Sequence, residues 1–208
     1  MTAAVNTALA GMTAAKNEVA AMLAGAGILS GNTTYHLNVL NGEDTAENLA
    51  IRNANQALID ALPRNLGGHT LTVEIPGFFY FGADWAGYNF RGFYNGELLI
   101  RGGTISGDSD SGLYVLDCAC RVHVWKLVFH GGNAAIQAWG CPDLLVSGCS
   151  FGGSYNTDGP DPGGAAVILI NSRAYMGGDP DIDSYSFWGG TNAYGAGVTP
   201  VKTIQTTN

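Results

Sequence analysis

Four aspartates in the last third of the chain are the side chains whose chemistry is easiest to name. Glycoside hydrolysis uses two carboxyl groups roughly 5–10 Å apart, on either side of the sugar bond. Asp158 and Asp161 share one loop-like segment, and Asp181 and Asp183 stand two residues apart. These four are the catalytic candidates for a polysaccharide depolymerase. Asp-Gly-Pro and Asp-Pro are also ordinary turn sequences, so we favour a chain without catalytic activity.

A calcium site is the second chemistry that acidic residues suggest. Asp179, Asp181 and Asp183 alternate along the chain and offer the carboxylate oxygens that Ca²⁺ prefers. The segment lacks the glycine and the distant glutamate of an EF-hand loop. We therefore predict neither a bound metal nor a cofactor.

The cysteines raise the question of a soft metal. Cys118, Cys120 and Cys141 lie close together in the predicted fold, but their spacing is not that of the usual zinc sites. Cys149 falls at a position expected to point inward, as a small core residue. Reduced thiols packed in the interior are the favoured interpretation.

Tryptophans can bind glycans by stacking their rings on sugars. Trp125, Trp139 and Trp188 are the candidates for glycan binding, and packing within the protein is the alternative. His123 and His130 are predicted to point outward. The histidines show no spacing typical of a metal site or of a Ser/His/Asp arrangement.

Composition excludes several classes of function. The chain has 208 residues, of which 46% are hydrophobic and 12% charged, and its formal net charge is −8. This charge argues against a nucleic-acid partner. No apolar run is long enough to cross a membrane, and no signal peptide is recognisable at the N-terminus. The 31 glycines, which follow no collagen period, suit a fold with many tight turns.

A ten-residue pattern recurs four times and must position all of these side chains. Its copies begin at Leu98, Val122, Leu144 and Pro180. In each copy two alternating apolar residues are followed by a two-residue step, two more alternating residues and a glycine. Alternation by two is typical of a strand with one buried face. A repeat of about 22 residues, with two or three short strands in each turn, predicts a parallel β-helix of about five turns.

The repeat also predicts which residues stack on one another. A second short strand accompanies each copy, at Leu113/Val115, Ile136/Ala138 and Val167/Leu169. The predicted inward columns are Leu98–Val122–Leu144, Ile100–Val124–Val146–Ile182 and Ile105–Phe129–Phe151–Phe187.

Apolar residues also fall at outward positions. Leu99, Trp125, Val128 and Leu145 would form one large apolar patch if they all faced water. We therefore expect them to be covered by a loop of this chain or to form an interface between subunits.

The first third of the chain predicts two helices. Residues 2–24 are rich in alanine and carry a short coiled-coil seam, so they form either an oligomeric stalk or a helix packed on its own domain. Residues 33–40 resemble a strand. An amphipathic helix is then expected from Asp44 to Pro63, with Ile51, Ala54, Leu58 and Leu62 on one face. The predicted organisation is a stalk and linker at 1–31, a capped β-helix at 32–190, and a C-terminal tail or last turn of the coil at 191–208.

The order of these elements resembles a known family. A strand, Asn41-Gly42-Glu43-Asp44, an amphipathic helix, and Gly67-Gly68-x-Thr70-Leu71 leading to Pro76-Gly77 precede the repeats. This order is similar to the start of the right-handed β-helices of bacteriophage tailspikes and tail fibres, and the resemblance covers roughly residues 33–190. It implies a helix that plugs the N-terminal end of the coil.

The resemblance also carries functional expectations. It implies a homotrimer in the phage tail that contacts other virion tail proteins and binds host cell-surface polysaccharide, and many members of the family cleave that polysaccharide. We expect a structural, adhesive protein of the virion, made in the host cytoplasm. A glycoside hydrolase or lyase on the same scaffold is the alternative, and a bacterial surface adhesin is a third possibility.

Overall fold

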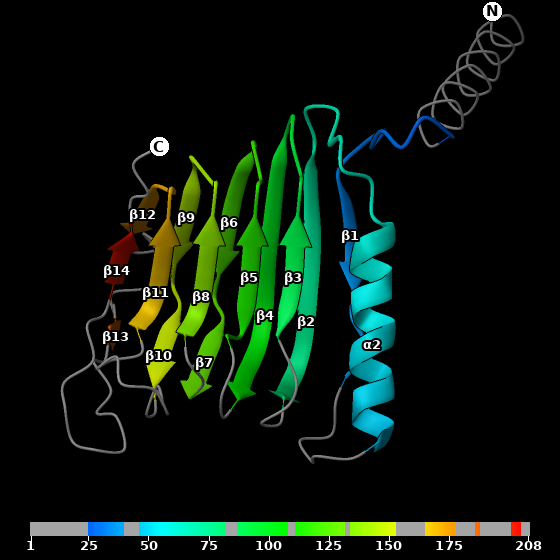
Figure 1. Cartoon of the computed structure of the whole chain (residues 1–208). Helices are drawn as coiled ribbons and strands as arrows, with labels where there is room; N and C mark the ends of the chain where they lie inside the picture. Colours follow the sequence, from blue (N-terminus) through cyan, green and yellow to red (C-terminus); the bar gives the residue numbers. More distant parts are fainter. Residues whose placement is uncertain are drawn as a thin grey trace, which may run out of the picture.

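The computed structural model describes residues 25–39, 46–81, 87–107, 111–131, 134–152, 165–177, 186–187 and 201–204. Parallel strands make up most of this part of the chain, together with one long helix (Figure 1). The elements are β1 (Thr33–His36), α2 (Ala46–Ala61), β2 (Thr70–Phe81), β3 (Tyr88–Arg91), β4 (Glu97–Gly107), β5 (Leu113–Leu116), β6 (Arg121–Trp125), β7 (Val128–Gly131), β8 (Ala134–Trp139), β9 (Leu144–Ser147), β10 (Ser150–Gly152), β11 (Ala165–Ile170), β12 (Ala174–Gly177), β13 (Ser186–Phe187) and β14 (Val201–Ile204).

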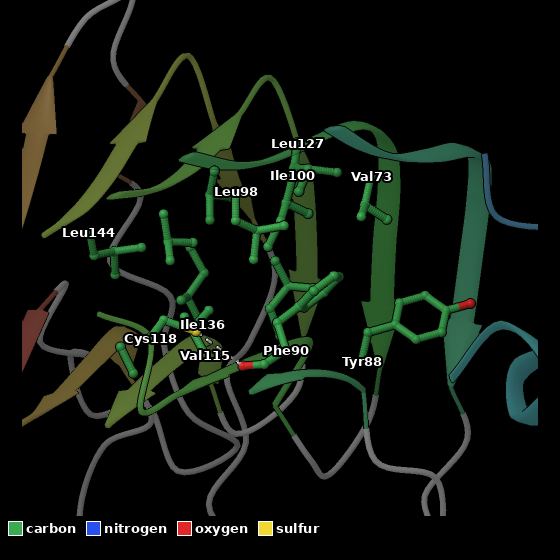
Figure 2. Packing of buried hydrophobic residues seen from close by; sticks show 14 of the residues in the cluster. Val73, Tyr88, Phe90, Leu98, Ile100, Val115, Cys118, Leu127, Ile136 and Leu144 are labelled. Atoms are coloured by element: carbon green, nitrogen blue, oxygen red, sulfur yellow. Dashed lines mark hydrogen bonds between the residues drawn. The ribbon is translucent and has the colours of Figure 1, made fainter. Parts of the chain in front are cut away.

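The strands form two parallel sheets. The larger, nine-stranded sheet has the order β12-β9-β6-β4-β7-β10-β13, and β2 joins it by pairing with β4 and with β1. The smaller, five-stranded sheet has the order β14-β11-β8-β5-β3. The two sheets lie face to face, and buried side chains from both fill the space between them (Figure 2).

The prediction of a closed right-handed β-helix is wrong. The described residues form two separate parallel sheets, and no closed coil is seen among them. Strand β4 shows the physical reason. It continues through Gly102 and Gly103, where the repeat predicted a step, so that β6 pairs with its first half and β7 with its second. Apolar alternation specifies which side chains are buried, but the bends of the backbone decide whether a sheet closes.

The predicted stacking of the first three copies is confirmed. Leu98 pairs with Val122 and Val122 with Leu144, and all three are fully buried. Phe129 stacks on Phe151 with ring centroids 5.3 Å apart and an interplanar angle of 7°. The second strands are confirmed as well, because β5, β8 and β11 pair in sequence. Like residues therefore stack on like through the core, as the repeat predicted.

The fourth copy is only half confirmed. Ser186–Phe187 does pair with Ser150–Phe151. The neighbour of β9, however, is β12, so Val146 pairs with Met176 and not with Ile182. The predicted pairing of Ile182 with Val146 is therefore wrong. The pattern at Pro180 lacks an apolar first position, and residues 174–177 supply the better alternating segment.

Helix α2 confirms the predicted amphipathic helix and lies next to β1 at the edge of the sheets, where it contacts β3 (Figure 1). Three of the four residues predicted on its buried face are confirmed, because Leu62 is buried and Ile51 and Leu58 pack against the core. Ile59 and Leu62 are buried, but Ala54 is exposed and the neighbouring Asn55 is fully buried. The amide of Asn55 is accommodated there because it hydrogen-bonds to Asn38 and to the hydroxyl of Tyr88.

The two ends of the chain are described only in part. Residues 1–24, which hold the predicted stalk, lie outside the described residues. In the predicted tail, Val201–Ile204 forms β14 and pairs with β11 at the edge of the smaller sheet. Within the described part of the chain, no helix has the length and apolar character needed to span a membrane.

Candidate functional site

A groove with a volume of about 450 Å³ lies between α2 and the outer face of the five-stranded sheet. Its lining comes from α2, from β3, β5 and β8, and from the residue just before β3. The lining residues are Arg52, Gln56, Asp60, Gly87, Asn89, Tyr114, Leu116, Gln137 and Trp139.

The lining residues on β3, β5 and β8 point into the groove because side chains alternate between the two faces of a strand. Phe90, Val115 and Ala138 are fully buried in the core, so the residues before and after each of them point outward. Asn89, Tyr114 and Gln137 are register partners on β3, β5 and β8 and form one row across the sheet. Leu116 and Trp139 form part of the next row. The floor of the groove is thus a ladder of polar and aromatic side chains.

The helix wall is fixed to the edge of this sheet. The side chain of Gln56 donates to the carbonyl oxygen of Asn89 at 2.9 Å and accepts from its N–H at 2.9 Å. Arg52 donates through Nη2 to the carbonyl oxygen of Gly87 at 3.0 Å. These contacts satisfy backbone groups at the open edge of β3. These hydrogen bonds therefore fix the position of α2 relative to the five-stranded sheet, so the groove is formed without a ligand.

The polar groups in the groove include both donors and acceptors. The Oδ1 atom of Asn89 is buried and has no hydrogen-bond partner among the described residues. Arg52 and Asp60 bring opposite charges to the helix side, while the Trp139 ring is 47% exposed at the other side. Concave sites that combine aromatic surface with a few polar groups are typical of small-molecule binding.

The structure separates the predicted glycan-binding residues. Trp139 lines the groove. Trp125 lies on the outer face of the other sheet, half-buried, with Lys126 Nζ 4.3 Å and Arg101 Cζ 5.9 Å from its ring centroid. Its ring is thus largely occupied by contacts within the chain. Trp188 lies outside the described residues.

The predicted catalytic and calcium-binding residues belong to parts of the chain that the structure does not describe. Asp158, Asp161, Asp179, Asp181 and Asp183 all lie outside the described residues. Within the described part of the chain, no three His, Cys, Asp or Glu side chains are grouped so that they could hold a metal ion.

The residues predicted to form a subunit interface lie on the outer face of the nine-stranded sheet. Leu99, Trp125, Val128 and Leu145 are each half-buried there. They alternate with polar positions, because His123 stands between Leu99 and Leu145 in the register. The face is therefore a mixture of apolar and polar side chains.

All four cysteines are free and buried, as the sequence predicted. The Cys118 thiol bonds to the carbonyl oxygen of Leu116 at 3.4 Å, and the Cys141 thiol bonds to that of Trp139 at 3.2 Å. Burial raises the pKa of Cys120 to about 12 and that of Cys149 to about 11. Cys120 and Cys149 are therefore protonated structural groups.

The sequence identified Trp139 but missed the rest of the groove. Gln56, Asn89 and Gln137 did carry a signal, since they are polar residues beside apolar ones on the helix and the second strands. Their convergence depends on how α2 packs against β3. No protein-family model, curated protein or solved structure matches the chain. The functional argument therefore rests on geometry and on the sequence patterns.

Proposed function

We propose that this chain is a structural and adhesive component of a bacteriophage tail fibre or tailspike, and that it binds host-surface polysaccharide in the groove beside α2. The observation that carries the proposal is the exposed Trp139 ring next to a row of amide and hydroxyl side chains. A sugar presents a C–H face that packs on an aromatic ring and hydroxyl groups that bond to amides.

The composition of the groove favours binding over cleavage. Among the nine residues that line it, Asp60 carries the only carboxyl group. Both the retaining and the inverting mechanism of glycoside hydrolysis commonly use a pair of carboxyl groups. Asp60 is also engaged, because its Oδ1 accepts a hydrogen bond of 3.0 Å from Gln56. A groove of this kind holds a glycan without breaking it.

The phage context is supported by the sequence resemblance over roughly residues 33–190. The proposed trimer would meet through the predicted stalk at residues 1–31. The outer face of the nine-stranded sheet is the less favoured contact, since Trp125 already packs against Lys126 and His123.

Glycan binding is tested by titrating the chain with oligosaccharides cut from the surface polysaccharide of candidate host bacteria, using calorimetry. Trp139→Ala should weaken binding by about 10- to 100-fold, because it removes the stacking surface. Tyr175→Ala is the matched control, since Tyr175 is an aromatic residue 51% exposed on β12 of the other sheet. Equal binding by Trp139→Ala and the unmodified chain would refute the groove as the glycan site.

A further inference from the structure

Three side chains with complementary chemistry meet on the outer face of the nine-stranded sheet, on the side of the molecule opposite the groove. The Nε2 atom of His123 lies 2.7 Å from the Oγ of Ser147. The Nδ1 atom of the same ring lies 3.8 Å from Oε1 of Glu97. A hydroxyl, an imidazole and a carboxylate therefore follow one another in the order of a nucleophile, a general base and a positioning acid.

The strand register brings these residues together. His123 on β6 pairs with Leu99 on β4 and with Leu145 on β9. Glu97 stands two residues before Leu99, and Ser147 stands two residues after Leu145. They are thus the diagonal neighbours of His123 on opposite sides, within reach of a long or polar side chain. Glu97 therefore lies near Nδ1 of the His123 ring, and Ser147 lies near Nε2.

Glu97 is held in the orientation that this arrangement needs. Its Oε2 accepts a hydrogen bond of 3.2 Å from the hydroxyl of Thr70, which leaves Oε1 on the side of His123. A carboxylate beside Nδ1 favours the tautomer that carries its proton there. The lone pair of Nε2 then faces Ser147 and can accept the proton of its hydroxyl.

The surroundings of Ser147 limit what could react there. Ser147 is the last residue of β9, and Gly148 follows with a φ of 59°, so the backbone turns directly after the hydroxyl. Its register partner on β12 is Gly177, which adds no side chain on that side. Trp125 is its partner on β6 and forms a wall on the other side. Ser147 is only 7% exposed, so only a small group could reach Oγ.

We propose that Ser147, His123 and Glu97 form an acyl-transfer site that hydrolyses esters of small carboxylic acids, such as acetyl esters. Ser147 Oγ attacks the carbonyl carbon while His123 Nε2 takes its proton. The carbon–oxygen bond to the alcohol then breaks, and His123 returns the proton to the leaving oxygen. Water then attacks the acyl carbon of the acyl-serine while His123 Nε2 takes its proton. The bond from this carbon to Ser147 Oγ breaks, His123 returns the proton to Oγ, and the carboxylic acid is released. Glu97 is a positioning residue that stabilises the protonated imidazole. This proposal is independent of the groove.

Labelling gives the direct test. The full chain is incubated with a small alkyl fluorophosphonate, which phosphonylates an activated serine and releases fluoride, and the modified residue is mapped by mass spectrometry. We expect one adduct, at Ser147, and no adduct in His123→Asn. Labelling of other serines alone, or no labelling, would overturn the proposal.

Turnover is measured with p-nitrophenyl acetate as the probe. Ser147→Ala and His123→Asn should lower the rate by about 100-fold or more, because they remove the nucleophile and the base. Ser150→Ala is the matched control, since Ser150 is a half-buried serine on β10 that faces the same side, and it should keep the full rate. Circular dichroism checks that each variant is folded.

Glu97→Gln separates a positioning role from a structural one. Loss of the carboxylate should lower the rate and also shift the midpoint of the rate–pH profile to lower pH, because the imidazolium loses its partner. A lower rate with an unmoved midpoint would contradict the role given to Glu97. The site also requires this face to stay open, so a subunit contact through Leu99 and Leu145 would abolish labelling and overturn the proposal.

Discussion

The side-chain amide of Asn55 on α2 donates a hydrogen bond of 2.7 Å to the hydroxyl of Tyr88 on β3, and both residues are fully buried. The same Asn55 side chain bonds to the backbone of Asn38, with its Oδ1 2.8 Å from the N–H and its Nδ2 3.0 Å from the carbonyl oxygen. One buried amide therefore ties the helix to the smaller sheet and to the segment after β1.

Replacing Asn55 should be costly for this reason. Asn55→Ala removes the hydrogen bond to the Tyr88 hydroxyl and the two bonds to the backbone of Asn38, and we expect a loss of about 3 kcal/mol in the free energy of unfolding. Tyr88→Phe removes one bond and should cost about 1 kcal/mol. Urea unfolding measures both. Asn53→Ala, an exposed asparagine on the same helix, is the control, and equal losses at 53 and 55 would contradict the network.

Gly103 should tolerate no side chain. A Cβ there would collide with the carbonyl oxygen of Gly77, where β2 shifts its register against β4. We expect Gly103→Ala to destabilise the chain by about 3 kcal/mol or more, because backbone atoms must move. Gly31→Ala is the matched control, since a Cβ at Gly31 meets nothing within 4 Å. Thermal unfolding of the two variants should differ clearly, and similar melting temperatures would refute the close approach of the strands.

Cys141 should accept serine better than valine. Its thiol bonds to the carbonyl oxygen of Trp139, and Ser172, the next residue in that column, makes the equivalent bond of 2.9 Å to Ile170. Cys141→Ser keeps a donor for the Trp139 carbonyl and should cost about 1 kcal/mol. Cys141→Val removes the donor and should cost more, about 2 kcal/mol. The reverse order in urea unfolding would show that packing outweighs the hydrogen bond.

Stability should fall in alkali. Burial raises the pKa of Cys149 to about 11 and that of Cys120 to about 12, whereas thiols in the unfolded chain ionise near pH ~8.5. Between these values the folded chain keeps protons that the unfolded chain has released. Stability is therefore complete below pH ~8.5 and declines as pH rises, by about 1.4 kcal/mol per pH unit for each thiol.

Urea unfolding between about pH 8 and pH 11 checks this decline. Burial raises the pKa of Tyr88 as well, which steepens the decline above pH ~10. Cys149→Ala is the test variant. Its slope should be smaller by the contribution of one thiol, and a slope equal to that of the unmodified chain would exclude Cys149 as a source.

The mass in solution should reveal the proposed assembly. Light scattering of the full chain should give a trimer, and a shortened chain that starts at Thr33 should give a monomer if the predicted stalk holds the subunits together. A trimer from both chains would move the contact to the body, and Leu99→Glu would then test the outer face of the nine-stranded sheet. A monomer from both would remove the trimer from the proposal.

The amino-acid sequence by itself determined the strands of the first three copies, their register and their buried columns. Leu98, Val122 and Leu144 could be aligned from spacing alone because alternation along a strand is a local property, and burial of like residues follows from it. The free, buried cysteines and the amphipathic helix followed from similar local patterns. The prediction for the fourth copy was wrong in its first half, where Pro180 weakens the apolar pattern.

Only the tertiary structure decided whether the strands close into a coil and which side chains from different elements come into contact. Whether the repeats close into a coil depends on backbone bends, and β4 continues as a single strand through the expected step. The groove exists because Gln56 on α2 reaches the edge of β3, a contact between residues 33 positions apart. Glu97, His123 and Ser147 likewise meet only through diagonal contacts across three strands. Such contacts depend on long-range packing, which alternation along a single strand does not encode.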